Sequence, residues 1–60
     1  MLKKYLNVKE LSRLTRLKQS TIYQWAGQGK IPHIRLGKKI LFDPDEINKW
    51  IDKNAVKVGM

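Results

Sequence analysis

The stretch LKQSTIYQWAGQGKIP, residues 17–32, decides the fold of this chain. At 3.6 residues per turn, Ile22, Trp25 and Ala26 fall on one side of a helix and supply core residues. The opposite side is uncharged and carries small or hydrogen-bonding residues: Ser20, Gln24 and Gly27, flanked by Thr21, Tyr23 and Gln28. A solvated helix face usually carries Lys and Glu, whereas this face can donate hydrogen bonds to phosphates and contact base edges. An ordinary amphipathic helix is the alternative.

The length and composition predict one small domain without cross-links. Sixty residues bury only about 60% of their unfolded surface, so the core must be compact. The chain has no Cys, and its single His33 cannot build a metal site alone, so we expect neither a disulfide nor a metal or other cofactor. It lacks the apolar run of a signal peptide or a membrane span, which predicts a cytoplasmic protein without a membrane partner.

Positive charge is concentrated in the first 42 residues. The net charge is +8, and residues 1–42 hold ten of the 13 Lys and Arg residues but only one of the five acidic residues. This asymmetry suits a polyanion on one side of the molecule. A basic surface that serves solubility alone is the alternative.

Capping signals predict a first helix at residues 8–15. Asn7 can cap it, and Glu10 three residues later completes a capping box. The apolar residues of this helix form one stripe, Val8, Leu11 and Leu14.

A short connection, residues 15–18, leads to a second helix at residues 19–28. So short a link makes the two helices cross at a large angle, as in a helix-turn-helix, with Leu17 filling the corner. Gly29 is expected to end the helix as its C′ residue. Gly27 costs about 1 kcal/mol relative to Ala inside a helix. It either permits close backbone approach on the exposed face or marks early fraying.

Residues 33–42, HIRLGKKILF, predict a short β-hairpin with Gly37-Lys38 at its tip. We expect one apolar face that packs on the helices, formed by Ile34, Leu36, Ile40 and Phe42. The other face and the tip are expected to carry Arg35, Lys38, Lys39 and Leu41. A basic hairpin after a helix-turn-helix is a wing that contacts the DNA backbone or minor groove; a plain hairpin with a solvated tip is the alternative.

The last helix has the clearest start signal, the sequence DPDE. Asp43 caps the helix, Pro44 takes the first position and Glu46 completes a capping box. We place this helix at residues 44–54, followed by a tail at 55–60. Its apolar stripe is Ile47, Trp50 and Ile51.

The predicted fold is mainly α with a small β-hairpin, a winged helix-turn-helix that forms a single domain over residues 1–60, with its core at 5–54. The segment Tyr5 to Lys53 resembles the excisionase-type DNA-binding domains, small winged relatives of the MerR regulators. The matching stretches are YLNVKELS at 5–12, STIYQW at 20–25, GKIP at 29–32, IRLGKK at 34–39 and FDPDEINKW at 42–50.

The resemblance implies a recognition helix in the major groove and a wing at the minor groove or the phosphates. The predicted recognition-helix contacts are Gln19, Ser20, Thr21, Tyr23, Gln24 and Gln28. The predicted backbone and wing contacts are Lys18, Arg35, Lys38, Lys39 and Arg16.

Three departures from the family pattern have consequences. Lys18 stands where a capping Ser is common, which costs about 1 kcal/mol unless a nearby phosphate offsets it. Gln19 and Gln24 stand where Arg is frequent, and because Gln pairs with adenine whereas Arg pairs with guanine, an A·T-leaning target is expected. Leu41 replaces a basic residue, and is either simply exposed or in contact with a neighbouring protomer on DNA.

The leading hypothesis is a sequence-preferring double-stranded DNA-binding protein of the excisionase type. It would be a recombination directionality factor that bends DNA near a recombination site together with an integrase. The short chain favours this role and predicts side-by-side copies on repeated sites. Such a protein would be bacterial or phage-encoded and nucleoid-associated.

Two other functions stay open, a small prophage-type transcription regulator and a DNA-targeting adaptor subunit of a larger assembly. We expect no enzyme, because the sequence offers no nucleophile–base pair, no paired carboxylates in a pocket-forming context and no phosphate loop. His33 is expected to cap the start of the wing.

Overall fold

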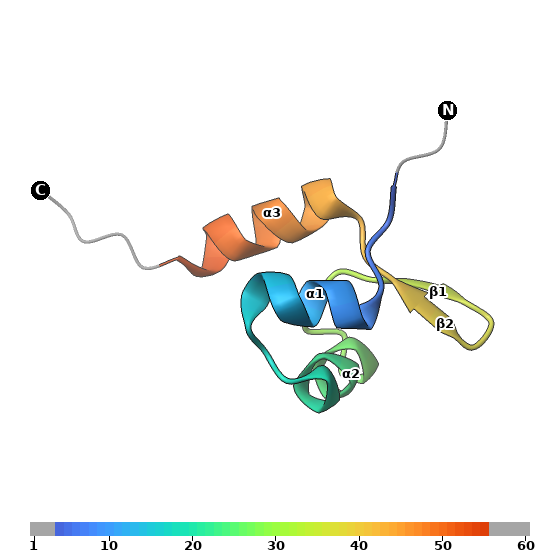
Figure 1. The fold of residues 1–60 in the computed structure, drawn as a ribbon. Coiled ribbons are helices and arrows are strands. Elements are labelled where there is room, and N and C mark those ends of the chain that lie inside the picture. Colours follow the sequence, from blue (N-terminus) through green and yellow to red (C-terminus); the bar gives the residue numbers. More distant parts are fainter. Residues whose placement is uncertain (1–3, 56–60) are drawn as a thin grey trace, which may run out of the picture.

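The computed structural model describes residues 4–55, which form three helices and one β-hairpin (Figure 1). The elements are α1 (Val8–Thr15), α2 (Gln19–Gly27), β1 (Ile34–Leu36), β2 (Lys39–Leu41) and α3 (Pro44–Asn54). This order confirms the predicted winged helix-turn-helix, and α1 and α3 have the predicted bounds. The helix predicted at 19–28 ends one residue earlier, because Gln28 is its C-cap. Of the predicted tail, residues 56–60 lie outside the described residues.

Side-chain caps fix where α1 and α3 begin. The Asn7 side-chain oxygen accepts a hydrogen bond from the Glu10 N–H (2.8 Å), and the Glu10 carboxylate accepts one from the Asn7 N–H (3.0 Å). The Asp43 carboxylate accepts a hydrogen bond from the Asp45 N–H (2.9 Å). These bonds satisfy backbone donors that the first turn of a helix leaves without partners. The predicted capping box of α1 and the predicted cap of α3 at Asp43 are thus confirmed. The capping box predicted for α3 with Glu46 was wrong, because Asp43 caps the helix through the Asp45 N–H instead.

The turn between α1 and α2 is held by backbone and hydroxyl hydrogen bonds. Arg16 has a left-handed backbone (φ 63°), and its N–H donates to the Ser12 carbonyl (2.7 Å). The Ser12 hydroxyl in turn donates to the Leu17 carbonyl (2.5 Å). Leu17 packs against the core, which confirms its predicted place at the corner.

The end of α2 is a Schellman motif built around Gly29. The Gly29 N–H donates to the Ala26 carbonyl (3.1 Å) and the Lys30 N–H to the Trp25 carbonyl (2.9 Å). This pair of bonds requires a left-handed residue between them, and Gly29 supplies it with a φ of 71°. The prediction that Gly29 is the C′ residue is confirmed.

The core joins all three helices with the segments that connect them. Its buried members are Val8, Leu11, Ile22, Ala26, Ile31, Phe42 and Ile47. Two residues predicted in the buried stripes are instead exposed, Leu14 by 62% and Ile51 by 38%. They lie in the last turns of α1 and α3, where they line an open apolar groove. The prediction was wrong because no described element packs over this end of the two helices.

The hairpin has the predicted tip but a different pairing of faces. Residues directly opposite each other in an antiparallel pair share a face. The opposed pairs are Ile34 with Leu41, Arg35 with Ile40, and Leu36 with Lys39. A two-residue turn at Gly37-Lys38 always places an even-numbered residue of β1 opposite an odd-numbered residue of β2. The prediction that Ile34 and Leu36 share a face with Ile40 and Phe42 was therefore wrong.

Only one face of the hairpin packs on the domain. Phe42 is buried and Ile40 packs against the core, so this face points inward. Leu36 lies on the other face and is 59% exposed. Leu41, expected on the outer face, is half-buried there. The hairpin thus carries an outward-facing apolar side chain that the sequence placed inside.

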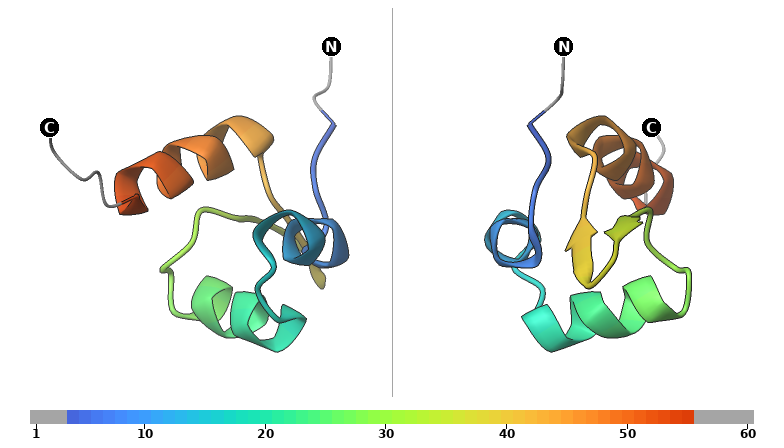
Figure 2. Two further views of the ribbon diagram at one scale, coloured as in Figure 1. Left: turned by 60° about the vertical axis from the view of Figure 1, so that its left-hand side comes forward. Right: turned by 90° about the vertical axis from the view of Figure 1, so that its right-hand side faces the viewer.

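The segment before α1 is tied to the end of the hairpin. The Leu6 N–H donates to the Phe42 carbonyl (2.9 Å), and the Phe42 N–H donates to the Leu6 carbonyl (2.8 Å). Figures 1 and 2 show α3 on one side of the molecule, α2 on the opposite side, and α1 with the hairpin between them. The outer side of α2 is therefore left free of other elements.

Candidate nucleic-acid interface

Helix α2 buries the predicted face and exposes the opposite one. Ile22 and Ala26 are buried, and Trp25 packs partly against the core. Five of the six predicted recognition-helix contacts are exposed, namely Gln19, Ser20, Tyr23, Gln24 and Gln28. The sixth, Thr21, is half-buried and lies at the edge of this face. The exposed face is thus uncharged and rich in hydrogen-bonding groups.

Gly27 leaves the backbone of α2 open on its outer side. A Cβ built at this position meets no atom within 4 Å, so nothing inside the domain requires a glycine here. The hydrogen bonds donated by Gly29 and Lys30 show that the helix does not fray at Gly27. Of the two alternatives weighed from the sequence, early fraying does not fit these bonds, and close backbone approach stays a prediction.

The start of α2 is a positive helix end without a side-chain cap. Lys18 is the N-cap residue and makes no side-chain hydrogen bond to the helix, and the first turn contains no acidic residue. The first N–H groups of a helix lack intrahelical partners and carry partial positive charge. Together with the positive charge that Lys18 carries at the N-cap position, they suit a phosphate.

The five predicted backbone and wing contacts are all exposed cations: Arg16, Lys18, Arg35, Lys38 and Lys39. Within residues 4–55 none of them forms an ion pair. Two come from the turn before α2 and three from the hairpin. Positive charge that is not neutralised inside the domain is available to an anionic partner.

The structure brings the wing next to the exposed side of α2. Tyr23 of α2 lines one surface hollow together with Lys38, Lys39 and Leu41 of the hairpin. Figure 2 shows the hairpin beside α2. Tyr23 is 54% exposed, so about half of this residue stays accessible even though it borders the wing. Helix α2 and the wing therefore share one continuous surface.

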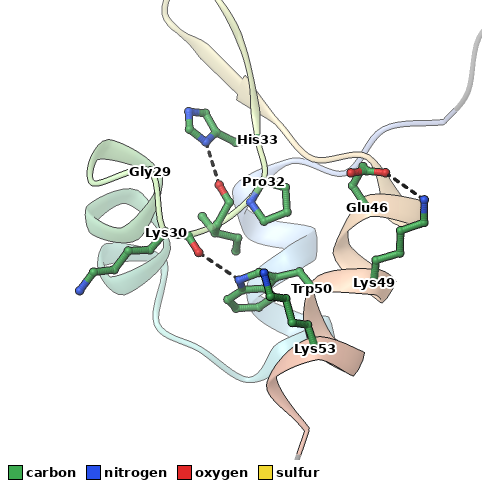
Figure 3. Close-up of a pocket in the computed structure, with 9 residues that line it drawn as sticks. Gly29, Lys30, Pro32, His33, Glu46, Lys49, Trp50 and Lys53 are labelled. Carbon is green, nitrogen blue, oxygen red and sulfur yellow. Dashed lines mark hydrogen bonds and ion pairs between the residues drawn. The ribbon is translucent and has the colours of Figure 1, made fainter.

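A second hollow, between the end of α2 and α3, is lined by residues that contact one another (Figure 3). The Trp50 Nε1–H donates to the Lys30 carbonyl (3.0 Å), and the His33 Nδ1–H donates to the Ile31 carbonyl (2.9 Å). The bond of His33 fixes the loop that leads into β1, which is the role expected for it. The Glu46 carboxylate lies 3.5 Å from the Lys49 Nζ. These groups organise the domain itself.

Leu36 is the surface residue that the sequence analysis missed. Because Leu36 is apolar, it was assigned to the inner face of the hairpin, although its position next to the tip indicates an exposed residue. With Gly37-Lys38 as the turn, Leu36 must pair with Lys39, and a residue paired with a lysine near the tip faces solvent. The strand register that a two-residue turn fixes would have been enough to predict that Leu36 is exposed.

A model of a helix-turn-helix domain family matches residues 5–55. Comparison with curated proteins and with solved structures finds no match. Among residues 4–55, no three His, Cys, Asp or Glu side chains gather as they would around a metal ion. None of the helices in that range is long and apolar enough to cross a membrane.

Proposed function

Since the chain belongs to the helix-turn-helix domain family, a family of DNA-binding domains, we propose that α2 lies in the major groove of double-stranded DNA. The observation that carries the proposal is the uncharged outer face of α2 beside cations that lack ion pairs within residues 4–55. The cations would position the protein on the phosphates, and the polar face would contact base edges. Phosphate contacts that position the protein, combined with base contacts, are typical of a sequence-preferring DNA-binding protein.

The two glutamines of α2 carry the proposed preference. Gln19 and Gln24 are exposed, and a glutamine amide can pair bidentately with the N6 and N7 groups of adenine. Gly27 near the other end of the same face would let the helix backbone approach the groove closely. We therefore expect an A·T-leaning target.

Within this function we propose an architectural role of the excisionase type. The protein would bend DNA at a recombination site, acting with an integrase and with side-by-side copies of itself, in the bacterial or phage nucleoid. The shared surface of α2 and the wing supports this role, because two contacts on one duplex can hold it in a deformed shape. Smooth bending of a short site costs on the order of 1–6 kcal/mol, which added contacts can offset. The role is binding rather than catalysis.

Selection of bound duplexes from a random DNA pool at near-physiological salt tests the proposal. Direct repeats about 10 base pairs apart, one helical turn, would support side-by-side binding and the excisionase role. Inverted repeats would instead indicate a dimeric transcription regulator. Binding without any enriched sequence would contradict the base contacts assigned to Gln19 and Gln24. Absence of binding to any duplex would overturn the DNA-binding function.

A matched pair of variants shows whether α2 makes the contact. Gln24→Glu places a negative charge on the proposed interface and should abolish enrichment. Asn48→Glu makes the same change in net charge at an exposed position of α3, on the opposite side of the molecule, and should leave enrichment intact (Figure 1). Equal loss in both variants would show that only the net charge matters.

A further inference from the structure

The tip of the wing combines one exposed leucine with three cations. Leu36 directly precedes the Gly37-Lys38 turn and is 59% exposed. Lys39 lies directly opposite it, and Arg35 and Lys38 are its near neighbours in the chain. All three cations are exposed and have no ion pair within residues 4–55. What sets Leu36 apart from the other exposed leucine, Leu14, is this setting among cations, which favours a partner that accepts positive charge as well as an apolar side chain.

The charge around Leu36 favours a nucleic acid over a protein as that partner. A second copy of this chain, with its net charge of +8, would bring further cations against Arg35, Lys38 and Lys39. A stable protein interface also buries at least about 1,000 Å², far more than one exposed leucine offers. The DNA minor groove has phosphates along both rims, and apolar side chains can insert from it between stacked base pairs, so it matches cations that surround an apolar side chain.

One face of the hairpin packs on the core, and Leu36 lies on the opposite face. Ile40 and Phe42 anchor the inner face on the core, so Leu36 and Lys39 point outward. Because the wing borders α2 at Tyr23, a duplex that holds α2 in its major groove has the neighbouring phosphate strand beside the wing. The outer face then meets the groove beyond that strand.

We propose that Leu36 inserts as an apolar wedge between two base pairs of this adjacent minor groove, while Lys38 and Lys39 contact the phosphates on its rims. The inference rests on the proposed DNA-binding function and deepens it. Apolar wedges of this kind unstack a base step and kink the duplex by about 20–90°. Pyrimidine–purine steps, TA and CA/TG, unstack most easily, so such a step is expected beneath the wing.

Two measurements on the selected duplex test the wedge. The first is the fluorescence of 2-aminopurine substituted for adenine at the step beneath the wing, which rises when its stacking is lost. The second is the bend angle, from energy transfer between dyes at the duplex ends. The wild-type chain should raise the fluorescence and bend the duplex. Leu36→Ala should leave the fluorescence near that of free DNA and reduce the kink below about 20°.

Leu14→Ala is the matched control, because Leu14 is also an exposed leucine (62%) but lies at the end of α1, away from the wing. It should keep both signals. Leu36→Met keeps an apolar side chain of similar volume at this position and should also keep both signals. Circular dichroism of each variant checks that the domain is folded.

Three results would overturn the inference. Wild-type binding without a rise in fluorescence would show that no base step is unstacked at the wing. An unchanged bend and fluorescence in Leu36→Ala would remove Leu36 from the contact. If Leu36→Ala kept a normal bend per bound protomer but weakened the binding of a second copy, Leu36 would contact a neighbouring protein instead of DNA. Each of these leaves DNA binding itself intact, whereas failure of the wild-type chain to bind any duplex removes the proposed function.

Discussion

The rings of Trp25 and Trp50 meet edge to face, with centroids 6.2 Å apart and planes inclined by 63°. Trp25 belongs to α2 and Trp50 to α3. The Trp50 Nε1–H also donates to the carbonyl of Lys30, just beyond the end of α2 (Figure 3). One side chain of α3 thus contacts both the last turn of α2 and the loop that follows it.

Trp50 is expected to stabilise the domain by two separable contributions. Trp50→Phe keeps an aromatic ring against Trp25 but removes the indole donor, and should lower the free energy of unfolding by about 0.5–1.5 kcal/mol. Trp50→Ala also removes the ring and should cost about 3 kcal/mol or more. Urea unfolding followed by circular dichroism measures both. Equal losses in the two variants would mean that the hydrogen bond, and not the ring contact, holds α3.

Lys18→Ser should raise stability and weaken DNA binding. A serine N-cap supplies the side-chain hydrogen bond that α2 lacks, worth about 0.5–2 kcal/mol. Loss of the ammonium group removes one phosphate contact, so the slope of log K against log salt should become less negative by about 0.9. Thermal unfolding and a salt titration measure the two effects. A stabilised variant with an unchanged salt slope would show that Lys18 does not touch the phosphates.

Arg16→Gly should also stabilise the fold, for a different reason. Arg16 has a φ of 63°, and an L side chain in this region costs on the order of 1–2 kcal/mol. Glycine avoids that cost, although part of the gain is offset because glycine frees the unfolded chain. Arg13→Gly, inside α1, serves as the control and should lose about 1 kcal/mol. Destabilisation of both variants would show that the Arg16 side chain contributes more than its backbone costs.

Gln24→Ala and Lys38→Ala should separate base contacts from phosphate contacts. If Gln24 pairs with a base, its loss should cost about 1–3 kcal/mol on the selected site and little on random DNA. Lys38→Ala should weaken binding to every duplex alike and flatten the salt dependence. Competition binding with selected and random duplexes measures the difference. Equal weakening of both duplexes by Gln24→Ala would remove its role in base recognition.

The sequence predicted best what short-range chemistry decides. The bounds of α1 and α3 follow from caps at Asn7 and Asp43, whose hydrogen-bond partners lie two or three residues away. The end of α2 follows from Gly29 in the same way. The outer face of α2 was also predictable, because helical periodicity alone separates Ile22 and Ala26 from Gln24.

Errors arose where a residue's environment depends on distant elements. Leu14 and Ile51 continue the periodic stripes of their helices, yet they are exposed because no described element covers that end of the domain. Leu36 was misplaced because the pairing of the two strands, not the alternation within one strand, decides which residues share a face. The proposed wedge at the wing lies beyond what the pattern of β1 alone could indicate.

The paired hydrogen bonds between Leu6 and Phe42 have a mechanical consequence. They brace the base of the wing against the segment that enters α1, so the wing cannot swing independently of the helix pair that carries α2. Helix α2 and the wing are then held at one fixed separation and orientation. A target with one base pair inserted between the stretches under helix and wing would present its second stretch rotated by roughly a tenth of a turn. Such a duplex should lose the wing contact while keeping that of the helix.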